Sequence, residues 1–211
     1  MSTSNTEPLV YIVDDDEAVR KSLRLLIQTV GLDVATYDSA RAFLADFDRD
    51  RPGCVLLDVR MPGCSGLELQ ERLRAAGSDI PVIIMTGHGD VPVAVRAMRG
   101  GAVDVMEKTS YREQELLETI QDALERDIAN REAKKAIDET ERRIATLTNR
   151  EHQIMELLVA GKPNKVIAYE LNVSIKTVET HRSKILEKMN VRSLVDLARI
   201  VVETRSASNA S

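Results

Sequence analysis

The sequence predicts an α/β domain with a doubly wound parallel sheet, followed by a long helix and an all-α domain of four helices. Three observations support this prediction. Short β-branched apolar runs alternate with stretches of helical spacing through the first half of the chain. A charged stretch without Gly or Pro follows, and the last 64 residues carry repeated helix-capping signals. A chain of 211 residues is long enough for two modest cores.

The apolar runs at residues 9–13, 54–57 and 81–85 are the clearest strands, because their composition suits burial on both faces of a parallel sheet. Residues 33–37 and 103–107 are weaker strand candidates. The intervening helices carry apolar residues at helical spacing: Val19, Leu23, Leu26, Ile27 and Val30; Phe43, Leu44 and Phe47; Leu67, Leu69 and Leu73; Val93, Val95, Ala97 and Met98. Five strand–helix units imply right-handed crossovers and a functional crevice at the carboxyl ends of the strands.

Residues 117–146 are predicted to form a helical linker between a first domain at 5–116 and a second at 147–205. Two apolar stripes lie along the linker, Leu117, Ile120, Leu124 and Ile128, then Ala133, Ile137, Ile144 and Leu147. The stripes are out of phase, which does not favour a continuous coiled coil. A solvated spacer and a signalling or dimerising helix are both compatible with this pattern.

The C-terminal domain is predicted to contain four helices. Thr148 opens a T-x-x-E capping box, and Gly161 ends the first helix. Residues 164–171 form a second short helix, and Ser174 and Ser193 cap the third and fourth helices. The tail at 206–211 is predicted to be disordered, because its residues are small and mostly polar.

The net charge of −5 is unevenly distributed. From residue 148 onward there are ten Lys and Arg against seven Asp and Glu, a net +3, whereas the preceding residues carry −8. This division permits a nucleic-acid partner for the second domain. Without a signal-like start or an apolar run of roughly 18 residues, we expect a cytoplasmic protein with no membrane partner. Cys54 and Cys64 have neither zinc-ligand spacing nor the number needed for a disulfide framework.

Acidic side chains follow two of the predicted strands. Asp14, Asp15 and Asp16 follow the first strand, and Asp58 follows the third. In a sheet of flavodoxin-like order these two strand ends are adjacent at the switch point. Clustered carboxylates repel one another and take up protons unless a divalent cation binds them. Oxygen ligands in a small open site favour Mg²⁺, which we therefore expect as the cofactor.

The same edge of the sheet carries groups suited to phosphoryl transfer. The Asp58 carboxylate can attack a phosphoryl group if positive charge stabilises the transferring oxygens. Lys108, after the fifth strand, can supply that charge, and Thr86, after the fourth, can donate a hydroxyl hydrogen bond to the phosphate. Each residue alone also has a structural interpretation, since Asp runs cap helices and Thr86 could end a strand. Their joint placement favours the chemical interpretation.

These segments also resemble a known family. VDDDEAVRKSL, LLDVRMPGCSGLEL, IIMTGHGDVPVAVRAM and GAVDVMEK resemble the CheY-like receiver domain of two-component response regulators, and GHGDVP resembles the FixJ branch. The segment LTNREHQIMELLVAGKPNKVIAYELNVSIKTVETHRSKILEKMNVRS is similar to the LuxR-type helix-turn-helix of the FixJ/NarL family. The resemblance covers nearly the whole chain, and both signals are specific.

The resemblance implies a phosphorylation-regulated DNA-binding transcriptional regulator, not an enzyme beyond the gain and loss of a phosphoryl group at Asp58. It implies Asp58 as the phosphoacceptor, with a sensor histidine kinase as the donor. Asp14 and Asp15 would form the acidic pocket, and Mg²⁺ would be held by Asp15, Asp58 and the Arg60 carbonyl. Thr86 would be the switch hydroxyl, and Lys108 the phosphate-binding cation.

Two departures from the family pattern lie near Lys108. Receivers usually follow this lysine with proline across a cis peptide, whereas Thr109 follows it here. A cis bond without proline costs about 2.5 to 4 kcal/mol, so we expect a trans or strained loop. Val105 stands where the family usually has an aromatic residue whose rotation reports phosphorylation. We expect the phosphorylation chemistry to survive and its coupling to the output to be altered or weaker.

The third C-terminal helix has the pattern of a recognition helix in the major groove. Val178, Ile185 and Met189 define its inner face, which leaves polar residues outward. Glu179, Thr180 and Ser183 could contact bases, whereas Lys176, Arg182, Lys184 and the helix start at Asn164 and Lys165 could contact phosphates. The predicted DNA-binding residues are Asn164, Lys165, Lys176, Thr177, Glu179, Thr180, Arg182, Ser183 and Lys184. A solvated side chain is the alternative for each charged residue.

Because one short helix reads few base pairs, we expect a homodimer on double-stranded DNA. The resemblance implies a dimer interface on the last helix, at Leu194, Leu197, Ala198 and Val201, and RNA polymerase as a further partner. In the inactive state the receiver could cover the recognition helix, and phosphorylation would shift the population toward the free arrangement.

Two other classes of protein compete with this interpretation. One is an enzyme of flavodoxin-like fold that binds FMN or acts as an aspartyl phosphatase. Three aspartates after the first strand would repel an FMN phosphate, and a phosphatase would not explain residues 148–201. The other is a receiver that regulates through protein contacts alone, which steeply salt-dependent DNA binding would exclude.

Overall fold

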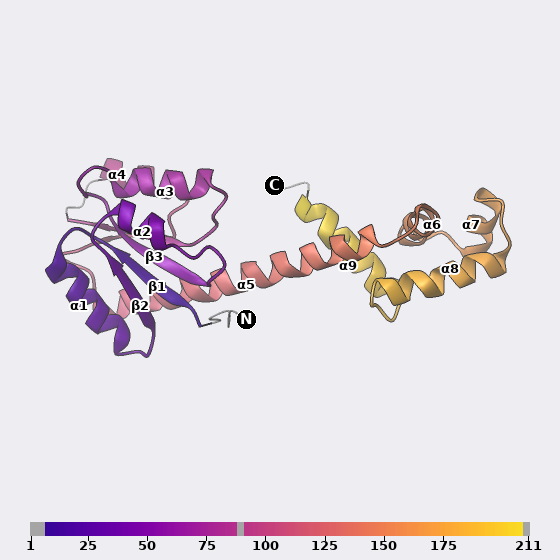
Figure 1. Cartoon of the computed structure of the whole chain (residues 1–211), viewed down its shortest axis with the longest axis horizontal. Coiled ribbons are helices and arrows are strands. Elements are labelled where there is room, and N and C mark those ends of the chain that lie inside the picture. Colours follow the sequence, from indigo (N-terminus) through magenta and orange to yellow (C-terminus); the bar gives the residue numbers. More distant parts are fainter. Residues whose placement is uncertain (1–6, 88–90, 209–211) are drawn as a thin grey trace. The chain divides into compact units, whose positions relative to one another are not determined.

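The computed structural model describes residues 7–87 and 91–208 (Figure 1). The chain divides after Arg131 into two compact units, each of which is considered by itself. No helix of the described residues is both long enough and apolar enough to span a membrane.

The first unit is a five-stranded parallel sheet with the strand order β2-β1-β3-β4-β5. The strands are β1 (Leu9–Val13), β2 (Asp33–Tyr37), β3 (Gly53–Asp58), β4 (Val82–Thr86) and β5 (Asp104–Glu107). The helices are α1 (Glu17–Gln28), α2 (Ala40–Asp46), α3 (Gly66–Ala75), α4 (Val91–Arg99) and the first part of α5 (Glu113–Ala145). All five predicted strands, including the two weaker ones, are confirmed.

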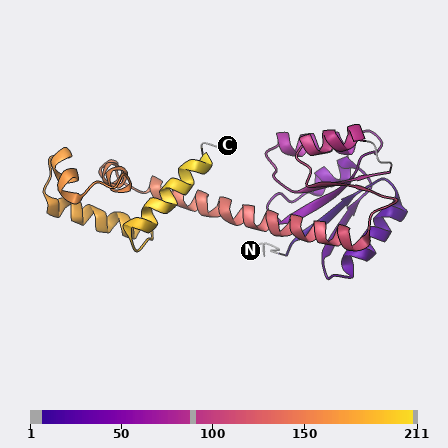
Figure 2. The same cartoon turned by 180° about the vertical axis from the view of Figure 1, so that it is seen from behind.

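Alternating side chains of the strands build a core on each face of the sheet. On one face Tyr11 and Val55 pack with Phe43 of α2 and Leu69 of α3. The other face is covered by α1 and the first part of α5 (Figure 2). Alternate strand residues such as Val10 and Ile12 pack with these two helices. The doubly wound α/β fold predicted from the alternating pattern is therefore confirmed.

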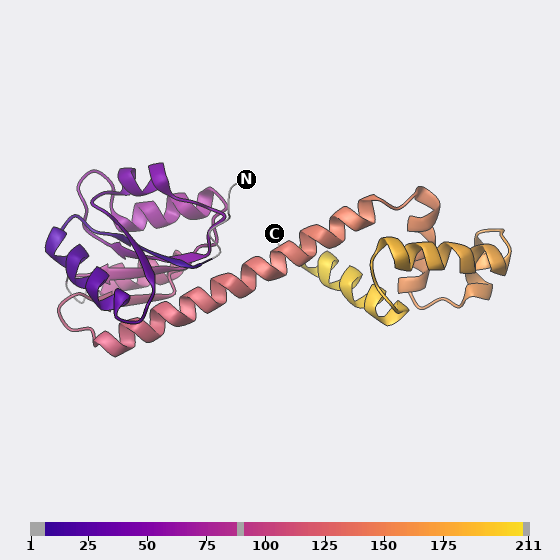
Figure 3. The same ribbon diagram turned by 60° about the horizontal axis from the view of Figure 1, so that its bottom comes forward.

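The first part of α5 belongs to the first unit. We expected the linker to begin at residue 117, but Leu116, Ile120 and Leu124 are buried against the sheet. The first unit consequently extends to Arg131, and α5 continues beyond it as one helix to Ala145 (Figure 3). The apolar stripe at the start of the expected linker thus packs on the sheet of its own unit.

A buried carboxylate fixes α5 on the sheet. Asp127, 2% exposed, accepts a hydrogen bond from the Gly53 N–H at the start of β3, at 2.9 Å. The same carboxylate pairs with Arg131 Nε at 2.6 Å, and Arg131 Nη1 donates to the Arg49 carbonyl at 2.7 Å. These bonds connect the end of the first unit to the amino edge of its sheet.

The second unit is all helical. It contains the remainder of α5, followed by α6 (Asn149–Val159), α7 (Asn164–Glu170), α8 (Ile175–Lys188) and α9 (Leu194–Ser208). The predicted capping box is present, with the Thr148 side chain accepting from the Glu151 N–H and the Glu151 carboxylate accepting from the Thr148 N–H. The four predicted helices are confirmed. α9 continues to Ser208, so residues 206–208 are helical where we expected the tail to begin, and residues 209–211 lie outside the described part.

Candidate functional site

The register of the sheet brings the predicted acidic and basic residues to one edge. Val13 pairs with Leu57, so Asp14 follows β1 next to Asp58, the last residue of β3. Thr86 ends β4 and pairs with Glu107, and Lys108 follows directly. The Lys108 N–H donates to the Thr86 carbonyl at 2.7 Å. Residues separated by more than 90 positions in the sequence therefore meet in one pocket.

Lys108 bridges two carboxylates in this pocket. Its Nζ lies 2.6 Å from Asp14 Oδ2 and 2.9 Å from Asp58 Oδ1. Asp14 and Asp58 are 1% and 5% exposed, and Lys108 is half-buried, whereas Asp15 is exposed at the mouth. A charged hydrogen bond away from water is stronger than its exposed counterpart, so the ammonium holds the two carboxylates together.

Burial and charge act in opposite directions on the pKa values in this pocket. Burial raises the pKa of Asp58 above its usual value, although the Lys108 ammonium and the Arg60 N–H partly offset this effect. Burial alone would lower the pKa of Lys108, but its hydrogen bonds to Asp14 and Asp58 outweigh that effect, and its pKa is raised. Lys108 therefore carries its positive charge at neutral pH.

The three aspartates after β1 have different positions. The Asp16 side chain caps α1 by accepting hydrogen bonds from the N–H groups of Ala18 and Val19. Asp14 Oδ1 accepts from the Asp16 N–H at 2.9 Å, which orients the carboxylate that meets Lys108. The Asp16 side chain therefore has a structural role.

The pocket also has the composition of a divalent-cation site. Asp14, Asp15 and Asp58 each offer a carboxylate oxygen, and these oxygens lie within 4.8 Å of one another. Oxygen donors alone, with one exposed carboxylate at the mouth, fit the hard cation Mg²⁺, which retains several waters. Receiver domains generally bind Mg²⁺ at such a pocket.

Two supporting residues were not found from the sequence. Arg20 Nη1 donates to the carbonyls of Asp14 and Asp15, at 2.7 and 2.9 Å, and so holds the acidic loop. Gly66 starts α3 so close to β3 that an added Cβ would overlap the Asp58 carbonyl oxygen. The position of Arg20 in the sequence does not indicate its contact with these carbonyls. Gly66, the last residue of GCSG, indicates only a turn.

The two departures from the family pattern have clear structural settings. The described residues contain no cis peptide, so the Lys108–Thr109 bond is trans, and Lys108 still reaches both carboxylates. Val105 is partly buried on β5 and packs against the core. In the GHGDVP motif, His88, Gly89 and Asp90 lie outside the described residues.

In the second unit, α8 shows the predicted division into two faces. Val178, Ile185 and Met189 are fully buried. Lys176, Glu179, Thr180, Ser183 and Lys184 are exposed, and Thr177 and Arg182 are half-buried. Several side chains of this outer face already form hydrogen bonds or ion pairs within the helix and its cap. Thr177 bonds to the Ser174 cap, the hydroxyls of Thr180 and Ser183 donate to carbonyls one turn earlier, and Lys176 lies 3.6 Å from Glu179.

The helix pair α7–α8 is held by residues of neighbouring helices. Lys188 Nζ, at the end of α8, lies 2.6 Å from Glu151 Oε2 in the first turn of α6. The hydrogen bond from Lys188 and the backbone hydrogen bond from Thr148 lower the pKa of Glu151 to about 2. Arg143 of α5 donates to the Met189 carbonyl at 3.1 Å. Asn164 and Lys165 lie at the start of α7, half-buried and exposed, and the helix has no side-chain cap.

The predicted dimer interface needs a correction. Leu197 and Val201 are fully buried in the core of the second unit, where they pack against α6, and Leu194 is partly buried there. They cannot reach a partner without opening that core. Ala198 is half-buried, and the exposed apolar residues of α9 are Val195 and Val202, 77% and 52% exposed. The apolar residues that were predicted to form the interface belong to the face of α9 that is buried in the core, not to its exposed face.

Comparison with known proteins agrees with this combination of sites. Residues 10–121 match the response regulator receiver domain, and residues 145–201 match the bacterial regulatory proteins of the luxR family. A receiver pocket and a helix-turn-helix in one chain define a DNA-binding regulator controlled by phosphorylation. The chain belongs to the response regulators that join a receiver domain to a luxR-family domain.

Relatives share this organisation over nearly their whole length. Transcriptional regulatory protein FixJ of Azorhizobium caulinodans is 45% identical over 194 residues, which cover 92% of this chain and 91% of the relative. Nodulation protein W of Bradyrhizobium diazoefficiens is 43% identical, over 93% and 86% of the two chains. Among solved structures, the response regulator StyR matches with a TM-score of 0.85 and 43% identity, over 93% of this chain and 99% of that one. The family implies a sensor kinase and DNA as partners.

Proposed function

We propose that Asp58 accepts a phosphoryl group from a phosphohistidine of a sensor kinase, and that this modification changes DNA binding by the second unit in the cytoplasm. One observation carries the proposal: the Lys108 ammonium bridges Asp58 and Asp14 in a pocket that also contains exposed Asp15. No other cation of the described residues forms an ion pair with Asp58.

The transfer is a displacement at phosphorus by an Asp58 carboxylate oxygen. The new P–O bond forms as the P–N bond to the donor imidazole breaks, and the imidazole leaves with the bonding electrons and takes a proton from solvent. Lys108, already 2.9 Å from Asp58, stabilises the negative charge on the transferring oxygens. Bound Mg²⁺, held by Asp15, Asp58 and the Arg60 carbonyl, would supply further positive charge. Hydrolysis of the acyl phosphate returns the free carboxylate.

Thr86 would carry the signal away from Asp58. Its carbonyl accepts a hydrogen bond from the Lys108 N–H at 2.7 Å, so the end of β4 is joined directly to the end of β5. A hydroxyl that turns toward the new phosphate would move β4 and the start of the following loop. Val105, packed in the core, lacks the aromatic ring that usually follows this movement. We propose that coupling to the second unit is therefore weaker than the family pattern implies.

The DNA-binding part of the proposal rests on the outer face of α8. Glu179, Thr180 and Ser183 would contact bases, and Thr177 would lie with them at the helix start. Exposed Lys176, Lys184 and Lys165, with half-buried Arg182 and Asn164, would contact phosphates. Homodimerisation would join two half-sites through Val195, Ala198 and Val202 of α9, and RNA polymerase would be a further partner of the bound dimer.

Labelling by acetyl phosphate with Mg²⁺ tests the phosphoryl step. We expect the intact mass of the wild-type chain to increase by one phosphoryl group and that of Asp58→Asn to stay unchanged. We expect Lys108→Gln to slow labelling by about 10²- to 10³-fold, as loss of one transition-state donor does. Lys21→Gln, which changes an exposed lysine of α1, is the matched control. Labelling of Asp58→Asn at the wild-type rate, with both proteins folded by circular dichroism, would refute the assignment.

A further inference from the structure

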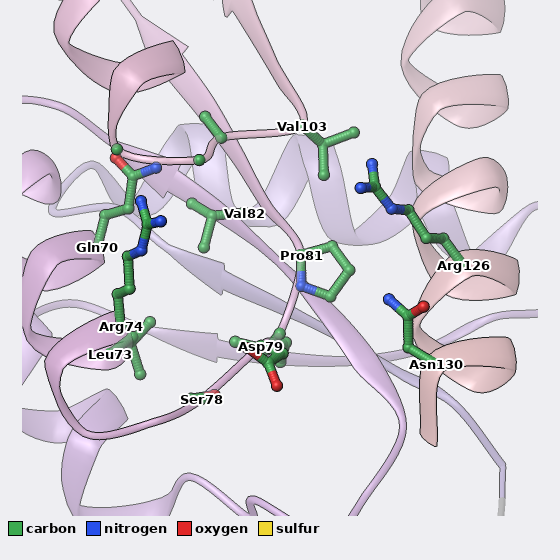
Figure 4. A pocket seen from close by; sticks show the side chains of 14 residues that line it. Gln70, Leu73, Arg74, Ser78, Asp79, Pro81, Val82, Val103, Arg126 and Asn130 are labelled. Carbon is green, nitrogen blue, oxygen red and sulfur yellow. The ribbon is translucent and has the colours of Figure 1, made fainter. Parts of the chain in front are cut away.

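The first unit has a second cavity, at the opposite edge of the sheet from Asp58. Val82 is the first residue of β4 and Val103 directly precedes β5, and both line this cavity of about 460 Å³ (Figure 4). Asp58 and Thr86, in contrast, end their strands. The cavity is therefore separate from the acidic pocket.

Two arginines from different helices flank an apolar floor in this cavity. Arg74 comes from the last turn of α3 and Arg126 from α5, and Figure 4 shows them on opposite sides of Pro81 and Val82. The cavity thus has a positive charge on each of two sides and an apolar surface between them.

Both guanidinium groups lack a partner within the described part of the chain. Neither Arg74 nor Arg126 forms an ion pair or a side-chain hydrogen bond there, and the same is true of the Asn130 amide. Nearby arginines differ, since Arg96 pairs with Glu71 and Arg131 with Asp127. Because Arg74, Arg126 and Asn130 are exposed, their hydrogen-bond donors face solvent and are accessible to a ligand, in a part of the chain that is otherwise acidic.

One carboxylate also lines the cavity. Asp79 is exposed and forms no ion pair with either arginine. In Figure 4 it lies below Pro81, whereas both guanidinium groups lie above it. Asp79 therefore leaves both guanidinium groups without an ion-pair partner.

We propose that this cavity binds a small organic dianion, either a phosphate monoester or a dicarboxylate, whose apolar body lies on Pro81, Val82 and Val103. A planar guanidinium binds phosphate and carboxylate through paired charge-assisted hydrogen bonds. The volume falls within the range of roughly 300–1,000 Å³ that is usual for small-molecule sites. A bound ligand would bridge α3 and α5, and α5 continues out of the first unit.

Calorimetric titration of the full chain with phenyl phosphate and with phthalate tests this proposal. The two probes share an aromatic body and differ in the anionic group. Asp58→Asn protein in buffer without Mg²⁺ keeps the phosphorylation pocket out of the measurement. We expect saturable binding of at least one probe, and a dissociation constant raised about tenfold or more by Arg74→Gln and by Arg126→Gln, since each loses a charge-assisted contact.

Arg72→Gln is the matched control, because Arg72 is exposed on the same helix and does not line the cavity. It should leave the dissociation constant unchanged. Binding of phenyl phosphate alone would identify a phosphate-ester site, and binding of phthalate alone a dicarboxylate site. Absence of saturable binding for both probes, or equal affinity in the Arg74→Gln/Arg126→Gln double variant, would overturn the proposal. Neither result depends on whether Asp58 is phosphorylated.

Discussion

At the scale of single residues, the acidic pocket depends on groups that lie far apart in the sequence. Asp14, Asp58 and Lys108 were predicted together because each follows a predicted strand, and parallel strands end at a common edge. Arg20 could not be predicted, because its contacts are to backbone carbonyls whose direction depends on the loop. The sequence therefore predicts the reactive residues of this pocket more readily than the residues that hold its loops in place.

Gly66 provides a test at this scale. An alanine there would force its Cβ against the Asp58 carbonyl oxygen, so β3 and α3 would have to separate. We expect Gly66→Ala to destabilise the first unit by about 1–3 kcal/mol, as overpacking does, and to slow labelling at Asp58. Chemical unfolding followed by circular dichroism measures the first effect.

The control is Gly87→Ala, because an added Cβ at Gly87 meets no atom of the described residues within 4 Å. Its unfolding free energy should stay close to that of the wild type. Equal stability of Gly66→Ala and Gly87→Ala would contradict the assigned role of Gly66.

At the scale of elements, α5 shows where sequence patterns lose information. Its apolar residues predicted a helix correctly, but they could not show that the first part packs on the sheet of the first unit. The second stripe belongs to the second unit, where Ile144 of α5 and Leu147, just after the helix, contact the helical core. The two apolar stripes pack against different cores, which explains why they are out of phase.

Asp127 should determine how firmly α5 is held. Replacing it by alanine leaves the buried Gly53 N–H without its acceptor and Arg131 without its partner. We expect Asp127→Ala to destabilise the first unit by about 3 kcal/mol. Hydrogen exchange should accelerate at Gly53 and along residues 117–131. Asp122→Ala changes an exposed aspartate of the same helix and should leave exchange unchanged; a similar response in both variants would exclude a specific role of Asp127.

Glu151 should make the second unit sensitive to acid. Its pKa in the folded state, about 2, lies below the usual value of 4.5. The folded state therefore gains stability above pH 4.5, and this gain is lost as the pH falls from 4.5 toward 2. We expect Glu151→Gln to be less stable than the wild type at pH 7, with the difference shrinking below pH 4.5. Hydrogen exchange of α6 and α8 amides measures it, and a difference that does not change with pH would contradict the role of the Lys188 pair.

At the scale of the whole molecule, the sequence predicted both folded units and the family, because their motifs are local and specific. Two of the residues predicted for a dimer interface are buried and cannot form one. Leu197 and Val201 were proposed as apolar residues of the last helix on the strength of the family resemblance, but both are buried in the unit's own core. Only the packing of α6 against α9 distinguishes the two faces.

The exposed face of α9 gives a prediction for dimerisation. Val195→Asp/Val202→Asp places charges on side chains that are exposed in the single chain, so the second unit should remain folded. We expect the double variant to bind a two-half-site DNA at least about tenfold more weakly, since loss of dimer contacts removes one half-site from the complex. Sedimentation with the DNA measures the stoichiometry. Leu25→Asp, at an exposed residue of α1, is the control, and an unchanged dimer in the double variant would exclude this face.

We propose that phosphorylation of Asp58 controls DNA binding by α8. The most direct test measures the affinity of the wild-type chain for genomic DNA fragments before and after treatment with acetyl phosphate and Mg²⁺, across a series of salt concentrations. We predict salt-dependent binding whose affinity changes on phosphorylation in the wild type and not in Asp58→Asn. Equal affinity of the labelled and unlabelled wild-type chain for every fragment would contradict the claim.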